Sequence, residues 1–297
     1  MPLTRPLAES VVVVTGASSG IGATTALLLA RHGTSVVLTA RDEASLARVA
    51  AACERRGGRA TWVAGDIAED GMARRVAARA TDEFGRLDAW INNAAVAEFC
   101  ALADVPPADM CRVIEVDVLG ALAGMQAAAP ILLAGGGGVI VNVTSVLART
   151  TVPWMGPYNA SKHALEGLTA TFRQELRAVG AHSVSVCTLL PATVDTPLFA
   201  HAANITGHPA RPLPPAYRPA KAARVLVRLL RRPRRRAYVG AAGRLTVASQ
   251  TLLPGPTERI LTTYGTKMGL DLLRHQPATA GNLRRALGPR PHSNRES

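Results

Sequence analysis

A tyrosine and a lysine four residues apart, Tyr158 and Lys162, form the one pattern in this sequence in which side chains rather than backbone could do chemistry. On a helix, residues at this spacing lie one turn apart on the same face. Ser145 precedes Tyr158 by thirteen residues and directly follows an apolar run over 139–143 that is typical of a buried strand. A phenol ionises near pH ~10, and a neighbouring cation lowers its pKa. A strand end that brings a hydroxyl to such a helix would make an acid/base site.

The spacing of Tyr158 and Lys162 is weak evidence by itself, because a pair four residues apart usually lies on a solvated helix face. Whether this pair forms a functional site therefore depends on the elements that surround it. The chain has 297 residues, of which 48% are hydrophobic and 4% aromatic, which suits an Ala-, Val- and Leu-rich α/β domain. Its apolar runs are interrupted by Pro or Gly, so we expect none to reach the ~20 residues that a membrane span needs.

Four cysteines, Cys53, Cys100, Cys111 and Cys187, are scattered without a Cys-x-x-Cys pair or clustered histidines. They predict reduced thiols rather than disulfides, and no metal site. The first ten residues lack the apolar segment of a secretory signal. Together these features predict a cytoplasmic protein.

Residues 10–33 have the order strand, glycine-rich turn, helix. A valine run within 10–15 is typical of a buried strand, and glycines follow at positions 16, 20 and 22. An Ala- and Leu-rich helix then ends near Gly33. Glycines allow a tight turn and a close approach of the backbone, and a helix N-terminus offers free N–H groups to a pyrophosphate. Because the turn joins the first strand to the first helix, it predicts a dinucleotide site.

The second strand, residues 35–40, ends at the position that distinguishes the two nicotinamide dinucleotides. An enzyme for NAD would have an acid there to accept from the ribose 2′-hydroxyl, whereas this chain has Arg41, which favours a 2′-phosphate. Ser18 and Ser19 could add donors to that phosphate. Asp42 fits better as the N-cap of the following helix than as a ribose acceptor. The predicted cofactor is therefore NADP rather than NAD.

Later strand ends carry polar residues as well. The strand over 60–64 leads to Asp66, which we expect at the adenine edge, and the strand over 87–91 leads to Asn92 and Asn93. Strands and helices alternate along the chain, which with right-handed crossovers predicts a three-layered, doubly wound parallel sheet, the Rossmann fold. One crevice at the carboxyl ends of the strands would then collect Gly16, Arg41, Asp66, Asn93, Ser145 and Pro191.

Taken in order, these motifs make the chain resemble the short-chain dehydrogenase/reductase family over about residues 8–240. They are TGASSGIG at 15–22, Asp66, NNAA at 92–95, Ser145, Tyr158 with Lys162, and PATVDT at 191–196. The resemblance implies that Tyr158 is the general acid/base, that Lys162 lowers its pKa and holds the nicotinamide ribose, and that Ser145 hydrogen-bonds the substrate oxygen. It also implies that Pro191, Val194 and Thr196 lie at the nicotinamide end.

Three positions depart from the family's pattern. Asp117 stands where the usual Asn helps to carry a proton relay, and a carboxylate near Lys162 would offset part of the cation's effect on Tyr158. Ala95 and Ala192 replace two usual glycines, which is tolerable where φ stays negative. The predicted catalytic residues are Ser145, Tyr158, Lys162 and Asp117. The predicted cofactor-binding residues are Gly16, Ser18, Ser19, Gly20, Ile21, Gly22, Arg41, Asp66, Ile67, Asn93, Ala94, Tyr158, Lys162, Pro191, Val194 and Thr196.

The function that the resemblance implies is NADP-dependent interconversion of an alcohol and a carbonyl on an unidentified apolar small molecule. A proline-rich loop over 198–219 is the expected substrate lid. The alternative is a catalytically weak protein of this fold that acts by binding or regulation. Ser145, Tyr158 and Lys162 are all retained, which favours the enzyme.

Positive charge is concentrated in the last third of the chain. Residues 211–297 hold 18 Lys and Arg against three acids, whereas residues 1–210 hold 16 against 18. An amphipathic basic helix over 220–230 and five arginines within 231–236 are interpreted either as a solvated helix on the sheet or as a contact with anionic membrane or an acidic partner. A specific nucleic-acid partner is not expected, because no aromatic residues are interleaved with the arginines.

The expected organisation is a Rossmann-fold catalytic domain over 1–240, a helical extension over 241–275 and a disordered tail over 276–297. The helices of the extension could cover the substrate pocket, form a dimer contact or lie on a membrane. We expect a homodimer or homotetramer, cytoplasmic or peripherally associated with a membrane.

Overall fold

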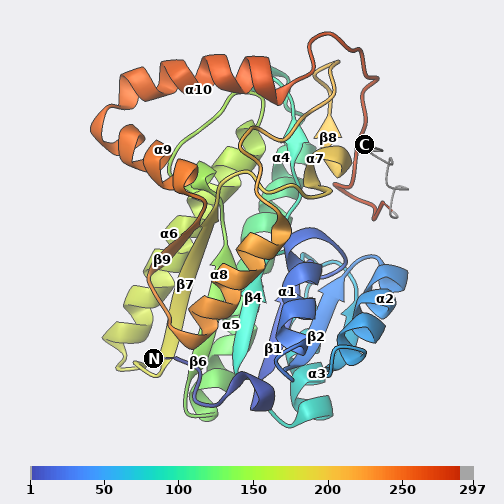
Figure 1. The fold of residues 1–297 in the computed structure, drawn as a ribbon, viewed down its shortest axis with the longest axis vertical. Helices are drawn as coiled ribbons and strands as arrows, with labels where there is room; N and C mark the ends of the chain where they lie inside the picture. Colours follow the sequence, from blue (N-terminus) through green and yellow to red (C-terminus); the bar gives the residue numbers. More distant parts are fainter. Residues whose placement is uncertain (1, 288–297) are drawn as a thin grey trace.

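A computed structural model describes residues 2–287 of the chain. Seven parallel strands form one sheet in the order β3-β2-β1-β4-β6-β7-β9 (Figure 1). The strands are β1 Val11–Thr15, β2 Ser35–Ala40, β3 Arg59–Ala64, β4 Ala89–Asn92, β6 Gly138–Val143, β7 Val184–Pro191 and β9 Arg236–Val239. The chain builds the sheet outward from β1 to β3 and then in the other direction from β4. A sheet of this topology has its ligand crevice at the strand carboxyl ends, where the order reverses between β1 and β4.

Helices cover both faces of the sheet, because its central strands are apolar on both sides. All five residues of β1 are buried; Val12 and Val14 face one helical layer, while Val11 and Val13 face the other. The first layer consists of α1 Gly20–Ala30, α2 Glu43–Glu54 and α8 Pro219–Arg231. The second consists of α3 Met72–Phe84, α5 Gly120–Ala134 and α6 Gly156–Ala178. The predicted three-layered parallel fold is confirmed.

The basic helix α8 is amphipathic in the way a helix on a sheet must be. Its residues Leu226, Leu229 and Leu230 are buried in the core beside α1. Its four basic side chains, Lys221, Arg224, Arg228 and Arg231, are exposed. The apolar face is therefore fully used by the fold, and only the cationic face remains for a partner.

A long helical segment, residues 107–134, is interrupted by a single wider turn. Helix α4, Pro107–Ile114, continues through a π-helical turn at Glu115–Leu119 into α5. Such turns often occur at functional sites, and this one contains Asp117. Because Pro130 lies within the helix and does not end it, Pro107–Ala134 is long and apolar enough to cross a membrane, contrary to our expectation from the interrupted runs. Its most apolar window is 56% buried within the protein, as in a core helix.

Two helices follow the last strand, as predicted. Helices α9, Ala241–Leu252, and α10, Pro254–Gly269, form a hairpin beyond the carboxyl ends of the strands (Figure 1). Between β7 and α8 lie the short helix α7, Leu198–His201, and β8, Ala203–Asn204, which pairs with β5, Glu98–Phe99. Short 3₁₀ turns occur at Leu7–Glu9, Leu102–Asp104 and Val146–Ala148.

The start of the tail has a defined path. Composition predicts disorder from residue 276, but Leu283 is completely buried and joins the core on the α3 and α5 side of the sheet. The prediction is therefore wrong for residues 276–287, because an apolar side chain and backbone carbonyls find partners there. Residues 288–297, also predicted to be disordered, lie outside the described residues.

Candidate active site

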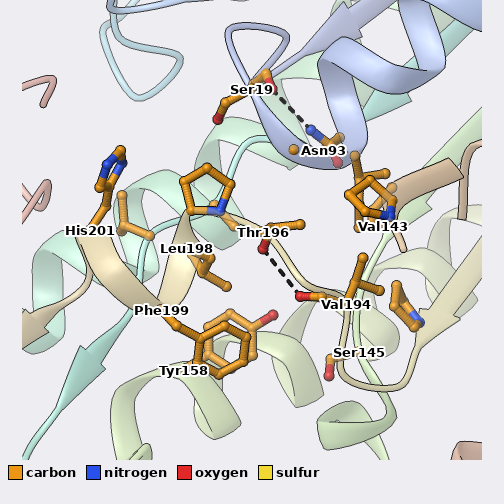
Figure 2. Close-up of a pocket in the computed structure, with 18 of the residues that line it drawn as sticks. Ser19, Asn93, Val143, Ser145, Tyr158, Val194, Thr196, Leu198, Phe199 and His201 are labelled. Atoms are coloured by element: carbon orange, nitrogen blue, oxygen red, sulfur yellow. Dashed lines mark hydrogen bonds between the residues drawn. The ribbon is translucent and has the colours of Figure 1, made fainter. Parts of the chain in front are cut away.

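A single large crevice, with a volume of about 1160 Å³, lies at the carboxyl ends of the strands. It is lined by every predicted cofactor-binding residue except Gly22, and by Ser145. Ser145, Tyr158 and Phe199 reach into it from different elements (Figure 2). The tertiary fold thus brings together predicted residues that are up to 180 positions apart, such as Gly16 and Thr196.

The glycine-rich turn forms a cradle in which two glycines are required. Gly16 has φ +63°, a conformation that glycine adopts without strain. A Cβ on Gly22 would collide with the carbonyl of Gly16 and with the Asn93 amide, so Gly22 acts by close packing. Asn93 Nδ2 donates to Thr15 O at 2.9 Å and to Gly16 O at 3.2 Å, which ties this turn to the end of β4. The cradle and the N-terminus of α1 fit the pyrophosphate of a dinucleotide.

Tyr158, Lys162 and Asp117 form a buried row beneath the crevice. Lys162 Nζ lies 5.0 Å from the centroid of the Tyr158 ring and 2.9 Å from Asp117 Oδ2. Asp117 is completely buried and also accepts from Val96 N at 2.8 Å and from Ser161 Oγ at 3.1 Å. It does not line the crevice, so it reaches the site only through its ion pair with Lys162 and through its charge. Sequence reasoning missed Ser161, although its position one residue before Lys162 places it in the same helical turn.

The electrostatics of this row set the proton affinity of the phenol. Burial raises the pKa of Tyr158; the Lys162 ammonium opposes that rise, Asp117 reinforces it, and a hydrogen bond with Ser145 opposes it. The net pKa lies above the ordinary value of tyrosine. Burial lowers the pKa of Lys162, but Asp117 and Tyr158 outweigh it and raise the pKa overall, so the lysine stays protonated at neutral pH. The phenol therefore has a permanent cation beside it, partly neutralised by Asp117.

At the opposite end of the crevice, two arginines converge on Asp66. Arg41 Nη1 lies 3.9 Å from Asp66 Oδ2, and Arg112 on α4 forms an ion pair with the same carboxylate. Asp42 caps α2, since its side chain accepts from Ser45 N at 3.0 Å, as predicted. Sequence reasoning missed Arg112, because no local motif places that turn of α4 against β2 and β3.

The other end of the crevice, where a substrate is expected, lies between the loop after β7 and the C-terminal helices. Thr196 Oγ1 donates to Val194 O at 3.4 Å, and Thr196 packs over Gly20 (Figure 2). The lining there is mostly apolar and includes Leu198, Phe199, Leu213, Leu261 and Tyr264. The expected lid loop thus contributes to the lining of the crevice, and so does α10. Tyr264 of α10 donates a hydrogen bond to the carbonyl of Pro214 in the lid loop, which joins the two segments.

The departures at Ala95 and Ala192 cause no backbone strain. Among residues 2–287, Trp154 is the only non-glycine residue with positive φ, at 67°. Trp154 lies just before α6, its carbonyl accepts from Cys100 N at 2.9 Å, and its indole donates to Thr266 of α10 at 3.4 Å. Strained backbone often occurs near functional sites. Here the strained residue, Trp154, anchors α10 beside the helix that carries Tyr158. The sequence holds no signal for this residue.

Comparison with known proteins agrees with the motifs and the fold. The family described as short chain dehydrogenase matches residues 10–205. The chain belongs to this family. It is 33% identical over 259 residues to the uncharacterized oxidoreductase YxnA of Bacillus subtilis (strain 168), covering 86% of this chain and 72% of that protein. It is an oxidoreductase of this family that interconverts alcohols and carbonyls.

Solved structures share the fold over most of their length. A short chain dehydrogenase/reductase from Burkholderia phymatum in complex with NAD is 28% identical, with a TM-score of 0.75, covering 82% of this chain and 93% of that one. The alcohol dehydrogenase from the archaeon Thermococcus sibiricus, complexed with 5-hydroxy-NADP, is 26% identical, with a TM-score of 0.68, covering 77% and 95%. Members of the family thus bind NAD or NADP.

Proposed function

We propose that the protein is an NADP-dependent dehydrogenase or reductase that uses Tyr158 to exchange a proton with the hydroxyl or carbonyl oxygen of an apolar small molecule. The observation that carries this proposal is the buried Lys162 ammonium, 5.0 Å from the ring of a tyrosine that lines the crevice beside Ser145. A solvated helix pair would not bury a lysine to 1% exposure.

In alcohol oxidation, the Tyr158 phenolate accepts the hydroxyl proton of the substrate, and the carbon that bears this hydroxyl gives up a hydride and becomes a carbonyl carbon. Bound NADP supplies the hydride acceptor, and NADPH supplies the donor in the reverse direction. In carbonyl reduction, the Tyr158 phenol gives its proton to the oxygen on which charge develops. The Ser145 hydroxyl is close enough to Tyr158 to hydrogen-bond the same oxygen and stabilise that charge. The positive charge of Lys162 stabilises the phenolate and so opposes the rise in the pKa of Tyr158.

The preference for NADP over NAD follows from Arg41, which lines the crevice at the end of β2. An arginine at this position provides a charge-assisted donor for a 2′-phosphate and no acceptor for a 2′-hydroxyl. Arg112 pairs with Asp66 beside Arg41 and adds a second cation for the same 2′-phosphate.

The substrate is proposed to be apolar, since hydrophobic and aromatic side chains from the lid and α10 line that end of the crevice. We also propose that the enzyme is a cytoplasmic homodimer or homotetramer. A peripheral contact with anionic membrane is supported by one feature of the extension and one of α8. Leu245, Leu252, Leu253 and Ile260 are 61–77% exposed on α9, α10 and their connection, and the basic face of α8 is free of core contacts.

Replacing Tyr158 by Phe tests the proposal directly. The phenol is assigned to chemistry rather than to affinity, so Tyr158→Phe should lose at least about 100-fold in kcat, as removal of a general acid/base does. Binding of NADPH, followed by its fluorescence, should stay within a few-fold of the parent. Near-normal turnover of an alcohol or carbonyl substrate in this variant would remove Tyr158 from the mechanism. A folded parent protein that leaves NADPH fluorescence unchanged would favour the binding or regulatory alternative.

A further inference from the structure

The described end of the tail crosses the cofactor crevice as a strap, which we define as residues 279–287. Thr279 pairs with Asn204 of β8 through two backbone hydrogen bonds of 2.8 and 2.9 Å. Asn282 N then donates to His201 O of α7 at 2.7 Å. Gly281 has φ +51° and fits tightly against the backbone of Ala202 and Ala203. These contacts run along the inner edge of the lid and direct the strap toward β2.

The strap ends on the two arginines at the adenosine end. Arg41 donates to Asn282 O at 2.7 Å and to Leu283 O at 3.2 Å. Arg112 Nε donates to the same Leu283 oxygen at 2.8 Å. Arg284 forms an ion pair of 2.6 Å with Asp109, at the start of α4. Two cations that flank Asp66 thus converge on one carbonyl oxygen.

The side chain of Leu283 fills an apolar space in the same region. It is completely buried and belongs to the core cluster that includes Ile67 and Val116, both of which also line the crevice. Asn282, Ala286 and Leu287 line the crevice together with Asp66. The strap therefore occupies part of the space that leads from the glycine-rich turn to the end of β3.

We propose that the strap is an internal competitor for the adenosine end of the dinucleotide, and that Arg112 reads the 2′-phosphate together with Arg41. This rests on the proposed function, in which the crevice binds NADP. The Leu283 side chain takes the place of the adenine ring, and the carbonyl oxygens of residues 282 and 283 stand in for phosphate oxygens. A dinucleotide must displace the strap before it can bind fully.

The chemistry of the arginine contacts gives the competition a preference. A phosphate dianion pairs its full negative charge with the arginine cations and can accept two parallel hydrogen bonds from one guanidinium, whereas a carbonyl offers them only a neutral acceptor. A ligand with a 2′-phosphate therefore displaces the strap more readily than one with a 2′-hydroxyl. The apparent affinity equals the intrinsic affinity multiplied by the fraction of molecules whose site is open. Weakening the strap increases that fraction and should therefore raise the apparent affinity.

Leu283→Ser in the full-length chain tests the strap. The probe is adenosine 2′,5′-bisphosphate, which carries the adenosine end without nicotinamide, and its dissociation constant is measured by calorimetry. We expect about tenfold tighter binding than in the parent, because a serine gives up the burial of one large apolar side chain that holds the strap in place. Leu273→Ser is the matched control: Leu273 is 97% exposed, so the dissociation constant should not change. Nicotinamide mononucleotide should bind equally to all three proteins.

Arg284→Ala provides a second test, because it removes only the ion pair with Asp109 at the rim. It should tighten binding of the bisphosphate several-fold. Arg112→Gln also loses a contact with the strap, which affects every adenosine ligand alike, so the test is the preference between two ligands. The variant should reduce the preference for the bisphosphate over 5′-AMP about tenfold.

Equal or weaker binding of the bisphosphate to both Leu283→Ser and Arg284→Ala, in variants that retain the parent's circular dichroism, would overturn the strap. It would mean that residues 279–287 help to build the site. If the parent and every folded variant fail to bind the bisphosphate and NADPH at millimolar concentration, the proposed function itself is refuted, and the strap with it.

Discussion

Replacing Asp117 by Asn would test how this chain tunes Tyr158, the proposed acid/base group. Asp117 Oδ2 lies 2.9 Å from Lys162 Nζ, which in turn lies 5.0 Å from the centroid of the Tyr158 ring. Because the two distances share Nζ, the carboxylate lies within about 8 Å of the ring, where two unit charges interact by about 2 kcal/mol at an effective dielectric constant of ~20. The negative charge of Asp117 raises the pKa of Tyr158.

Asp117→Asn removes that charge and should lower the pKa of Tyr158. Since about 1.4 kcal/mol corresponds to one pKa unit, we expect the acidic limb of the oxidation kcat/KM profile to move to lower pH by about one pH unit. That limb reports the base of the free enzyme, which must be deprotonated to accept the substrate proton. Carbonyl reduction needs the protonated phenol, so its alkaline limb should move in the same direction.

The substitution should also destabilise the fold, because it leaves the Lys162 ammonium buried without its carboxylate. Breaking a buried pair in this way costs roughly 3–5 kcal/mol of the free energy of unfolding. Asp88→Asn separates this effect from the electrostatic one. Asp88 is 1% exposed, accepts from Val11 N at 2.8 Å and pairs with Arg86 at 2.6 Å, just before β4 and away from the crevice. This control should lose stability and leave the pH profile unchanged.

A profile of Asp117→Asn that superimposes on the parent's would refute the electrostatic account. A limb that moves to higher pH would refute it as well, since that result means the lysine has lost its proton and no longer assists Tyr158. Chemical denaturation of each variant shows in parallel whether the protein is folded at the assay pH.

Three further expectations concern other parts of the chain. Arg41→Asp should lower the ratio of kcat/KM for NADP over NAD by at least about tenfold, since a hydrogen bond to a charged group is worth ~1.5–3 kcal/mol, and an unchanged ratio would remove Arg41 from phosphate recognition. The protein should sediment at low salt with anionic but not neutral vesicles, and Arg224→Glu with Arg228→Glu should abolish this; equal behaviour with both lipids argues for a purely solvated helix. Burial, and then Asp109, raise the pKa of Glu98 to about 7, so its contribution to stability is full below about pH 4.5 and is lost as the pH rises through 7. Between pH 5 and pH 8, the free energy of unfolding of Glu98→Gln should therefore fall less than that of the parent. The exposed Glu83→Gln should follow the parent. If the stability of Glu98→Gln varies with pH in parallel with the parent's, the Glu98 carboxyl is already ionised at pH 5.

Local patterns in the sequence were sufficient for the fold and for the order of the motifs. Valine runs such as that of β1 are apolar on both faces, which is typical of a sheet covered by helices on both sides, and strand-helix alternation with right-handed crossovers then predicts a doubly wound parallel sheet. The same alternation places the residue after each strand at one edge, which is why the positions of Gly16, Arg41 and Ser145 in one crevice could be predicted.

Only the tertiary structure decided which distant side chains meet. Asp117 and Lys162 are 45 residues apart, and their direct ion pair depends on a π-helical turn that the apolar pattern of that helix does not reveal. Arg112 and the strap were beyond sequence reasoning for a similar reason. Composition predicted disorder at the end of the chain, but a single leucine and two carbonyl oxygens bind there to groups that the fold assembles from β2, β3 and α4. Periodicity and motifs depend on near neighbours in the chain, whereas these contacts depend on packing between elements that are far apart in it.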